Sequence, residues 1–197
     1  MNPAIKNDNF AEDYTNLDLH STELVNIEFD ECTFTQCNFS HILFKSCHFS
    51  GCVFRNCELS LMKVVNSKFS DVEFVDCKII GVDWTKANWG SLIKKPMKFE
   101  SSVLNGSSFY GLGLEELILK GCEAKDVDFT GANLSESTVT YTDFRDAVFS
   151  HTNLSKANFS YAKNFDIDIK TNTLKGAIFS RYEAIRLLHG LEIVLID

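Results

Sequence analysis

The sequence repeats every five residues, and this period constrains the fold more than any other feature. Between Glu31 and Ser60, one position in each five carries a large apolar side chain: Phe34, Phe39, Phe44, Phe49, Phe54 and Leu59. The position two residues earlier carries Cys32, Cys37, Ile42, Cys47, Cys52 and Cys57. A period of five fits neither a helix, which repeats about every 3.6 residues, nor a simple strand, which alternates about every two. It fits a short extended step, which points both residues the same way, followed by a bend.

The same register continues from Tyr14 to Phe179. Among the positions reached in steps of five, only Lys94 and Asn164 are polar and Ala124 is small. All seven cysteines lie two residues before a position of this series, where other units carry Ala, Ser, Thr or Val. A unit this short cannot bury its apolar side alone, so copies must stack on one another. We therefore predict an all-β solenoid with one column of large and one column of small inward side chains on each side.

Composition and charge restrict the functional class. The 197 residues suffice for one domain with a continuous core, and we expect no cleaved signal or membrane-spanning segment. Seven cysteines, an odd number at inward positions, indicate reduced thiols and a cytoplasmic protein. The formal charge of −8 disfavours direct binding to nucleic acid or an anionic membrane and favours a basic partner.

Two interruptions break the repeat. The segment 90–98 places Lys94 at a core position and contains Pro96, which predicts a loop or bulge. Because the register resumes in the same phase at Phe99, we expect this loop to replace one pentapeptide. A second break at 163–164 comes near the end of the repeats. We therefore divide the chain into an N-terminal cap (1–13), a repeat region (14–179) and a tail (180–197).

The tail has a different pattern. Ser180 followed by Glu183 predicts a capping box that opens a helix over 181–189, and residues 191–196 predict a short strand. An exposed end of a solenoid needs a cap, and the tail is also apolar enough to pair with a second copy. We favour a homodimer over an end cap alone. The expected dimer-interface residues are Tyr182, Ile185, Leu187, Leu188, Leu191, Ile193 and Leu195.

The residue types that carry out chemistry do not form a convincing site. A cysteine and a neighbouring histidine, such as Cys47 and His48, should point to opposite sides of the wall, so they cannot complete a tetrahedral zinc site. The recurrent Asp and Glu residues precede the large apolar positions and are interpreted as a solvated surface without a pocket. We predict no catalytic, cofactor-binding or metal-binding residues, and hence a protein that is not an enzyme.

Three units resemble the consensus A-(D/N)-L-x-x of the pentapeptide repeat family: Ala132-Asn133-Leu134, Thr152-Asn153-Leu154 and Ala157-Asn158-Phe159. The resemblance covers nearly the whole chain. It implies a right-handed, four-sided β-helix with four pentapeptides per coil, so that residues 20 apart stack. With the tail, the implied fold is a quadrilateral β-helix followed by a short C-terminal helix and strand.

Other segments are similar to the branch of this family that protects topoisomerases. They are 75–84, 109–112, 167–169 and the tail, and they resemble albicidin-resistance members more than quinolone-resistance or microcin-immunity members. The resemblance implies a homodimeric rod that imitates DNA, binds DNA gyrase or a related type II topoisomerase, and protects it from a topoisomerase-poisoning antibiotic. The candidate topoisomerase contacts are Glu73, Asp83, Asp128, Asp143, Lys94 and Lys95.

The alternative is a non-catalytic scaffold with a different protein partner, because a fold does not determine a function. An acidic stripe on one side of the rod would favour the DNA mimic. Carboxylates spread over all four sides would favour the scaffold.

Overall fold

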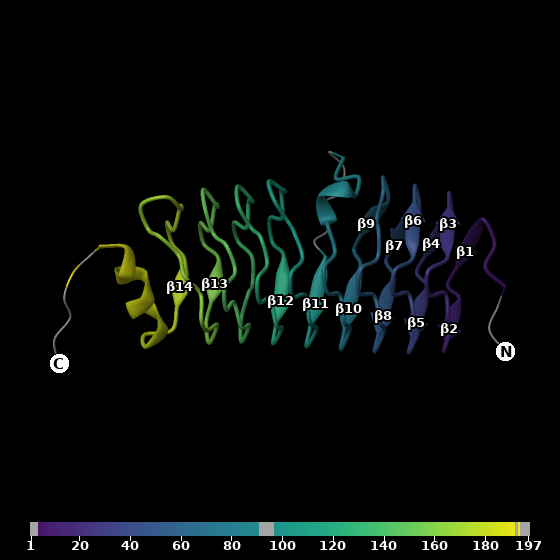
Figure 1. The fold of residues 1–197 in the computed structure, drawn as a ribbon, viewed down its shortest axis with the longest axis horizontal. Coiled ribbons are helices and arrows are strands. Elements are labelled where there is room, and N and C mark those ends of the chain that lie inside the picture. Colours follow the sequence, from purple (N-terminus) through teal and green to yellow (C-terminus); the bar gives the residue numbers. More distant parts are fainter. Residues whose placement is uncertain (1–3, 91–96, 192, 194–197) are drawn as a thin grey trace.

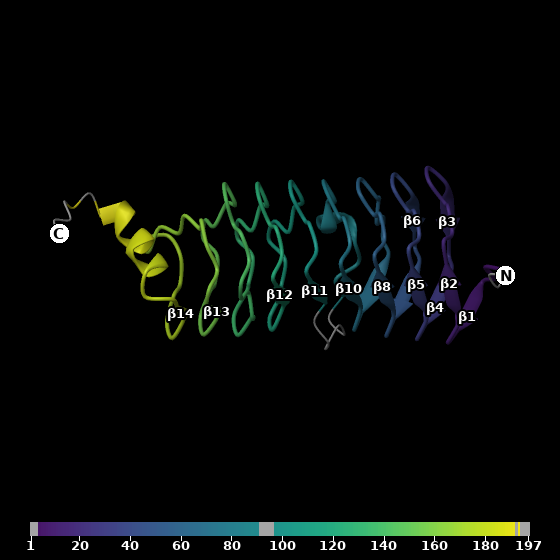
Figure 2. The same cartoon turned by 90° about the horizontal axis from the view of Figure 1, so that it is seen from below.

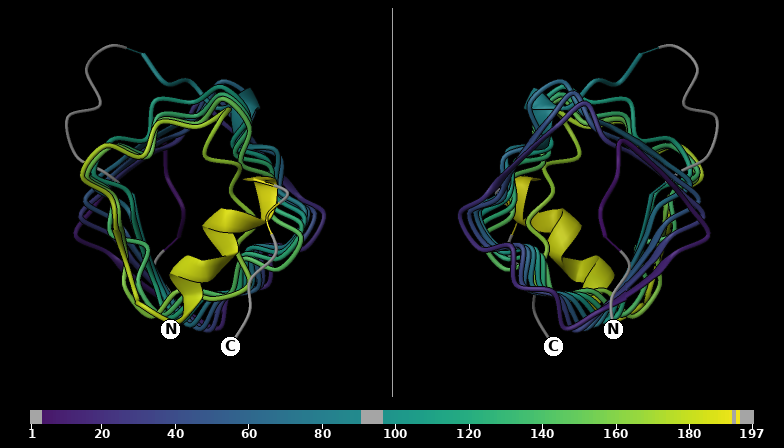
Figure 3. Two further views of the ribbon diagram at one scale, coloured as in Figure 1. Left: turned by 90° about the vertical axis from the view of Figure 1, so that its left-hand side faces the viewer. Right: turned by 90° about the vertical axis from the view of Figure 1, so that its right-hand side faces the viewer.

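The chain forms one straight rod of stacked coils that runs from β1 at one end to a helix at the other (Figures 1 and 2). The computed structural model describes residues 4–90, 97–191 and 193. Seen along its axis, the rod has a four-sided outline (Figure 3). Residues 20 apart pair side by side, as Asn9 pairs with Phe29 and Phe29 with Phe49. The predicted all-β solenoid of pentapeptide repeats is confirmed.

The walls are built from very short parallel strands, and we number the four sides in chain order. Side 1 contains β1 (Asp8–Phe10), β4 (Glu28–Asp30), β7 (His48–Ser50) and β9 (Lys68–Ser70). Side 2 contains β2 (Asp13–Thr15), β5 (Thr33–Thr35), β8 (Val53–Arg55), β10 (Glu73–Val75), β11 (Lys98–Glu100), β12 (Ile118–Lys120), β13 (Asn158–Phe159) and β14 (Ile178–Phe179). Side 3 is a ladder of single bridges from Asp18 to Lys163. Side 4 contains β3 (Glu23–Val25), β6 (Leu43–Lys45) and the 3₁₀ helix η1 (Trp84–Lys86).

The large inward residues form columns of stacked rings. On side 2, the ring centroids of Phe34 and Phe54 lie 4.7 Å apart, and Phe74 lies 5.0 Å from both Phe54 and Phe99. Rings of adjacent sides meet edge to face, as Phe34 and Phe39 do at 5.5 Å. Stacked and edge-to-face arrangements are the two that aromatic quadrupoles favour. One residue per unit, repeated at the coil spacing, thus gives a continuous apolar core, in which the rings of side 2 stack without interruption from Tyr14 to Phe99.

The smaller inward residues hydrogen-bond the backbones of neighbouring coils. The Sγ of Cys52 donates to the Phe29 carbonyl at 3.3 Å, and the Oγ1 of Thr142 donates to the Leu119 carbonyl at 3.0 Å. Ser102 also accepts from the Cys77 N–H at 3.0 Å. The column therefore favours side chains that are small and can hydrogen-bond, which explains why Cys, Ser and Thr recur there. All seven cysteines are buried and free.

The bend in each unit uses a left-handed backbone. The residue two places after the large apolar position has a positive φ in almost every described unit, and for residues other than glycine φ lies between 48° and 62°. None of these residues is Val, Ile or Thr. Branching at Cβ is poorly tolerated at positive φ, whereas Asn, Asp and Gly are enriched there. The bend thus explains which residues occur two places after the large apolar position, which the hydrophobic periodicity does not explain.

The first interruption adds residues to a coil, so the expectation that it replaces one pentapeptide is wrong. Phe74 pairs with Phe99, and Asp83 bridges to Ser108, so the step between neighbouring coils is 25 residues here instead of 20. The sequence register stays in phase because the insertion is itself five residues long. Trp89 lies before the insertion, and its Nε1 donates to the Trp84 carbonyl at 2.7 Å.

The repeat also begins earlier than expected. Strand β1 lies within the segment assigned to the N-terminal cap, yet it pairs with β4 in the repeat register. Asn9 occupies the large inward position of this strand and is 5% exposed. Its Nδ2 donates to the Glu28 carbonyl at 3.0 Å, and its Oδ1 accepts from the Tyr14 hydroxyl at 2.9 Å. An amide here ends the aromatic column and satisfies backbone groups at the end of the rod.

The second interruption shifts the last coil. Asn164 takes a left-handed conformation with φ 58°, and Phe165 points inward in its place. Phe149 then bridges to Ile167, 18 residues later. The register is recovered by Thr173, which bridges to Asn153, and β14 still pairs with β13.

The tail forms a 3₁₀ helix, η2 (Glu183–Leu191), so Leu191 belongs to the helix and not to the expected strand. Of the rest of that strand, only Ile193 lies within the described residues. The expected capping box is wrong. The Oγ of Ser180 accepts from the Tyr161 N–H at 2.7 Å, and Glu183 accepts from Arg186. Ser180 therefore ties the start of the tail to the preceding coil.

Candidate interaction surfaces

The repeated carboxylates have a structural task. Where a unit makes only a single bridge, the N–H that follows the large inward residue lacks a ladder partner, and the side chain two residues earlier accepts from it. Asp83 accepts from the Thr85 N–H at 3.0 Å, and Asp128 accepts from the Thr130 N–H at 2.9 Å. Asn133 does the same for Ser135 at 3.2 Å. The preference for Asp or Asn is thus a turn requirement, which either residue meets.

The predicted topoisomerase contacts do not lie together. Glu73 is on side 2, Asp143 on side 3, and Asp83 and Asp128 on side 4. Only the last two share a surface, where both bridge to Ser108 between them. Lys94 and Lys95 lie outside the described residues.

Acidic side chains occur on every side of the rod, as Glu28, Glu100, Glu58 and Asp128 do on sides 1 to 4. Within the described part of the rod, the carboxylates are therefore not confined to one side.

Asp83 and Asp128 differ in their freedom to meet a partner. The Asp83 carboxylate lies 3.6 Å from the Lys86 ammonium group. Asp128 makes no ion pair within the described residues. On the same side, Asp166 is exposed and also lacks an ion pair among the residues described. On side 4, the carboxylate near η1 is thus partly neutralised by a lysine, whereas those toward the C-terminal end are free, which here means without an ion pair among the described residues.

Asp143 is held within the protein. It is 8% exposed, its Oδ1 accepts from the Asn164 Nδ2 at 2.8 Å and the Arg145 N–H at 3.2 Å, and its Oδ2 lies 3.9 Å from the Lys163 Nζ. Burial by itself raises the pKa of Asp143, but these hydrogen bonds and the Lys163 charge outweigh it and lower the pKa. The carboxylate is therefore ionised and already satisfied by residues of its own chain.

Helix η2 lies across the end of the last coil and presents two surfaces (Figure 3). Leu187 packs against the core, whereas Tyr182 is 89% exposed and Ile185 50% exposed. Leu188 and Leu191 are half-buried, and Ile193 is 52% exposed. Leu195 lies outside the described residues. The predicted interface set thus divides into a residue that closes the core and apolar side chains left at the surface.

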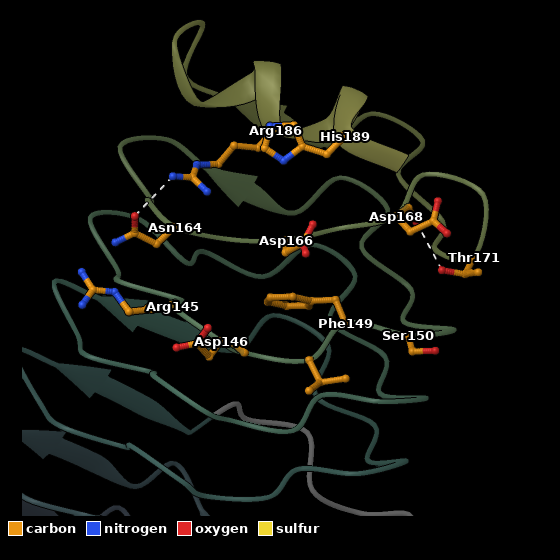
Figure 4. Close-up of a pocket in the computed structure, with 12 residues that line it drawn as sticks. Arg145, Asp146, Phe149, Ser150, Asn164, Asp166, Asp168, Thr171, Arg186 and His189 are labelled. Atoms are coloured by element: carbon orange, nitrogen blue, oxygen red, sulfur yellow. Dashed lines mark hydrogen bonds between the residues drawn. The ribbon is translucent and has the colours of Figure 1, made fainter. Parts of the chain in front are cut away.

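An open hollow of about 760 Å³ lies between η2 and the corner of sides 3 and 4 (Figure 4). Phe149, which bridges to Ile167 across the shortened step, is one of its lining residues. Its lining includes Arg145, Asp146 and Asp166, and Arg186 and His189 reach it from the helix. Sequence reasoning missed the contact between Arg186 and Asn164, although the polar Asn164 in an apolar register marked the place.

The described residues contain no cluster of three or more His, Cys, Asp or Glu side chains arranged to hold a metal ion. Within the same part of the chain, no helix has the length and apolar character needed to cross a membrane. Burial raises the pKa of Cys52 to about 12 and that of Cys122 to about 11, so these two thiols are poor candidates for chemistry. The hydrogen bond with Cys57 lowers the pKa of Cys77, but this thiol is buried in the core.

Two family profiles match the chain: a pentapeptide repeat region over residues 27–109 and eight copies of pentapeptide repeats over residues 128–163. The chain belongs to the pentapeptide repeat family. No curated protein matches its sequence.

Solved structures share the fold. A trypsin-treated variant of QnrB1, a plasmid-mediated fluoroquinolone resistance protein, is 21% identical over 96% of this chain and 92% of that chain, with a TM-score of 0.73. A second trypsin-treated QnrB1 variant is 20% identical over 93% of this chain and 100% of that chain, with a TM-score of 0.67. HetL, a pentapeptide repeat protein involved in heterocyst differentiation regulation in the cyanobacterium Nostoc sp. strain PCC 7120, is 15% identical over 87% of this chain and 84% of that chain, with a TM-score of 0.51.

Proposed function

We propose that this protein is a non-enzymatic DNA mimic that binds DNA gyrase or a related type II topoisomerase and protects it from an antibiotic of the quinolone or albicidin kind. In this proposal the protein acts in the cytoplasm as a homodimer joined through η2 and the residues that follow it. The observation that carries the proposal is a straight, four-sided rod of stacked coils in a chain with a formal net charge of −8. Its full-length similarity in fold to a fluoroquinolone resistance protein supports the same proposal.

The magnitudes indicate what kind of mimicry is possible. Roughly eight coils at ~4.8 Å give a rod of roughly 40 Å, and a dimer of about 80 Å. DNA of that length carries roughly 47 charges, at one per ~1.7 Å of helix axis. The chain carries a formal charge of −8, and a dimer twice that. The shape of the rod and local groups of carboxylates must therefore contribute more than total charge.

Side 4 is the surface that we assign to the topoisomerase. It carries two of the six expected contact residues, Asp83 and Asp128, and its free carboxylates lie toward the end where a second copy would join. Glu73 on side 2 becomes the comparison residue, and Asp143 is excluded because its own chain already satisfies it. Lys94 and Lys95 stay candidate contacts from the sequence alone.

The test is a gyrase supercoiling assay and a drug-stabilised cleavage assay, with purified protein titrated in, with and without albicidin or a fluoroquinolone. Rescue of supercoiling or loss of cleaved complex at sub-micromolar protein is the expected result. The variant Asp83→Asn/Asp128→Asn should weaken the effect, because asparagine keeps the turn hydrogen bonds and removes only charge. Glu73→Gln is the matched control on another side and should behave as the unmodified protein.

A scaffold for another basic protein is the second candidate function, and the spread of carboxylates over all four sides favours it. The same titration separates the two. A confirmed dimer without effect on gyrase at any concentration would refute the topoisomerase proposal and leave the scaffold. Inhibition without rescue would keep the DNA mimic and remove the protective role.

A further inference from the structure

The C-terminal helix is joined to the last coil by a chain of polar contacts centred on Asn164, of which Figure 4 shows the one between Asn164 and Arg186. The Asn164 Nδ2 donates to Asp143 at 2.8 Å, and its Oδ1 accepts from the Arg186 Nη2 at 3.4 Å. The Arg186 Nε donates to Glu183 at 2.9 Å, within η2 itself. One amide thus bridges an almost buried carboxylate of side 3 and a cation of the helix.

The helix is held at three places along its inner surface. Arg186 contacts Asn164 near its start, Leu187 packs against the core in its middle, and the Gly190 carbonyl accepts from the Lys170 Nζ at 2.8 Å at its end. The apolar contact alone does not determine how the helix is rotated about its axis. The directional contacts near its two ends, from Arg186 to Asn164 and from Lys170 to the Gly190 carbonyl, limit this rotation. Arg186 is next to Ile185 in the helix, so the contact to Asn164 bears most directly on which way Ile185 faces.

We propose that Asn164, fixed by Asp143, is a positioning residue for self-association: it orients η2 so that its outer apolar side chains can meet a second copy of this chain. This inference rests on the proposed dimer and assigns a new role to Asp143, which sequence analysis placed among the topoisomerase contacts. It also explains a polar residue in an otherwise apolar register. Moving Asn164 out of the core, with Phe165 in its place, keeps the column filled and frees the amide for the helix.

The backbone at this position offers a clean substitution. Asn164 has φ 58°, a conformation that glycine adopts without strain. Asn164→Gly therefore removes both amide contacts and leaves the bend intact.

A matched control is Asn66→Gly. Asn66 also has a positive φ, 53°, and its amide also makes two side-chain hydrogen bonds, to Ser46 and from Asn88, at 3.1 Å each. It lies at the bend after side 4 of the third coil, far from η2 along the rod.

The experiment is sedimentation equilibrium of the full chain and its variants, combined with hydrogen exchange of the peptide that covers η2. We expect Asn164→Gly to raise the dimer dissociation constant about tenfold, the size that corresponds to losing its one charged hydrogen bond to the helix, from Arg186. Hydrogen exchange in η2 should accelerate in the same variant. Asn66→Gly should leave both measurements within twofold of the unmodified chain.

A second pair of variants distinguishes positioning from a general loss of stability. Arg186→Gln should weaken self-association as Asn164→Gly does, and the double variant should be no weaker than either single one, because both remove the same link. Full additivity would overturn the inference. So would an unchanged dissociation constant in Asn164→Gly.

The inference can fail independently of the proposed dimer. If the unmodified chain is monomeric at every concentration, the proposed dimer is refuted, and with it the role in self-association. Hydrogen exchange of η2 then still reports whether Asn164 orients the helix. Protection of η2 that does not change in Asn164→Gly would refute the link itself, whether or not the chain is dimeric.

Discussion

The left-handed bend leads to a prediction in which two adjacent exposed residues should respond in opposite ways to the same pair of substitutions. Asn56 lies at a bend with φ 52°, and Arg55 lies immediately before it in strand β8. Both side chains are exposed, and neither makes a side-chain hydrogen bond or ion pair within the described residues. Backbone conformation therefore dominates the effect of replacing either one.

At the bend, valine should be worse than glycine. A left-handed conformation costs an L-residue about 1–2 kcal/mol, and branching at Cβ makes the conformation a true outlier. Glycine avoids this cost but loses about 0.5–1 kcal/mol through the larger entropy of its unfolded chain. We expect Asn56→Val to lower the free energy of unfolding by about 1–2 kcal/mol and Asn56→Gly to change it by less than about 0.5 kcal/mol, since Asn already tolerates the conformation better than most residues.

In the strand, the order should reverse. Arg55→Val places a β-branched residue in an extended conformation that suits it, whereas Arg55→Gly should cost about 1 kcal/mol relative to valine. The measurement is equilibrium urea unfolding of the four variants, followed by far-ultraviolet circular dichroism. If valine and glycine rank in the same order at both positions, the bend geometry does not control this column and the reasoning is refuted.

Three further predictions concern the core. Phe74→Ala should lower the free energy of unfolding by about 3–5 kcal/mol, because its ring lies 5.0 Å from those of Phe54 and Phe99 and the cavity cannot collapse between fixed coils; a loss below about 1 kcal/mol in urea unfolding would contradict this. The free energy of unfolding of Cys52→Ser should stay within about 1 kcal/mol of that of the unmodified protein, because a hydroxyl can donate to the Phe29 carbonyl as Ser102 does to the Phe74 carbonyl. Cys52→Leu should lower the free energy of unfolding by about 1–3 kcal/mol, because the larger side chain overpacks the core. Burial raises the pKa of the Cys52 thiol from 9.0 to about 12, so this thiol loses its proton at a lower pH in the unfolded chain than in the folded protein. Thermal stability should therefore fall as the pH rises from about 9 toward 12. Cys52→Ser should reduce that fall, and a variant with the same pH profile as the unmodified protein would contradict the raised pKa of Cys52.

The architecture could be predicted from the sequence because two positions of each unit point inward. One carries a large residue such as Phe54 and the other a small residue such as Cys52. It could not predict how many residues each coil contains. The insertion before Phe99 is five residues long, so it leaves the one-dimensional register unchanged and becomes visible only when Phe74 pairs with Phe99. Asn164 shows the opposite case, because the register is broken in the sequence, yet the alternative inward residue, Phe165, lies next to it.

The candidate site was harder to predict, because the sequence does not distinguish carboxylates that share one position in the repeat. Asp128 and Asp143 both precede a buried phenylalanine and both accept from a bend N–H. What separates them comes from the neighbouring coil: Asp143 meets Asn164 and Lys163, whereas Asp128 lies beside Val148 and Ser108. Contacts between coils depend on which residues lie 20 apart, and the shifted last coil alters that correspondence near the tail.

This double use of carboxylates makes fold and recognition separable by experiment. An asparagine at Asp83 or Asp128 still accepts the bend hydrogen bond, so the rod should persist while the surface loses charge. Asparagine is already present at the equivalent position in neighbouring units, such as Asn133 and Asn153, where it bonds Ser135 and Ser155 in the same way. Since the fold accepts either residue, the bend does not require an aspartate such as Asp128, which makes no ion pair with the residues that the structure describes. Selection for a basic partner can act at such positions. Substitutions there change binding to the partner while the fold stays intact.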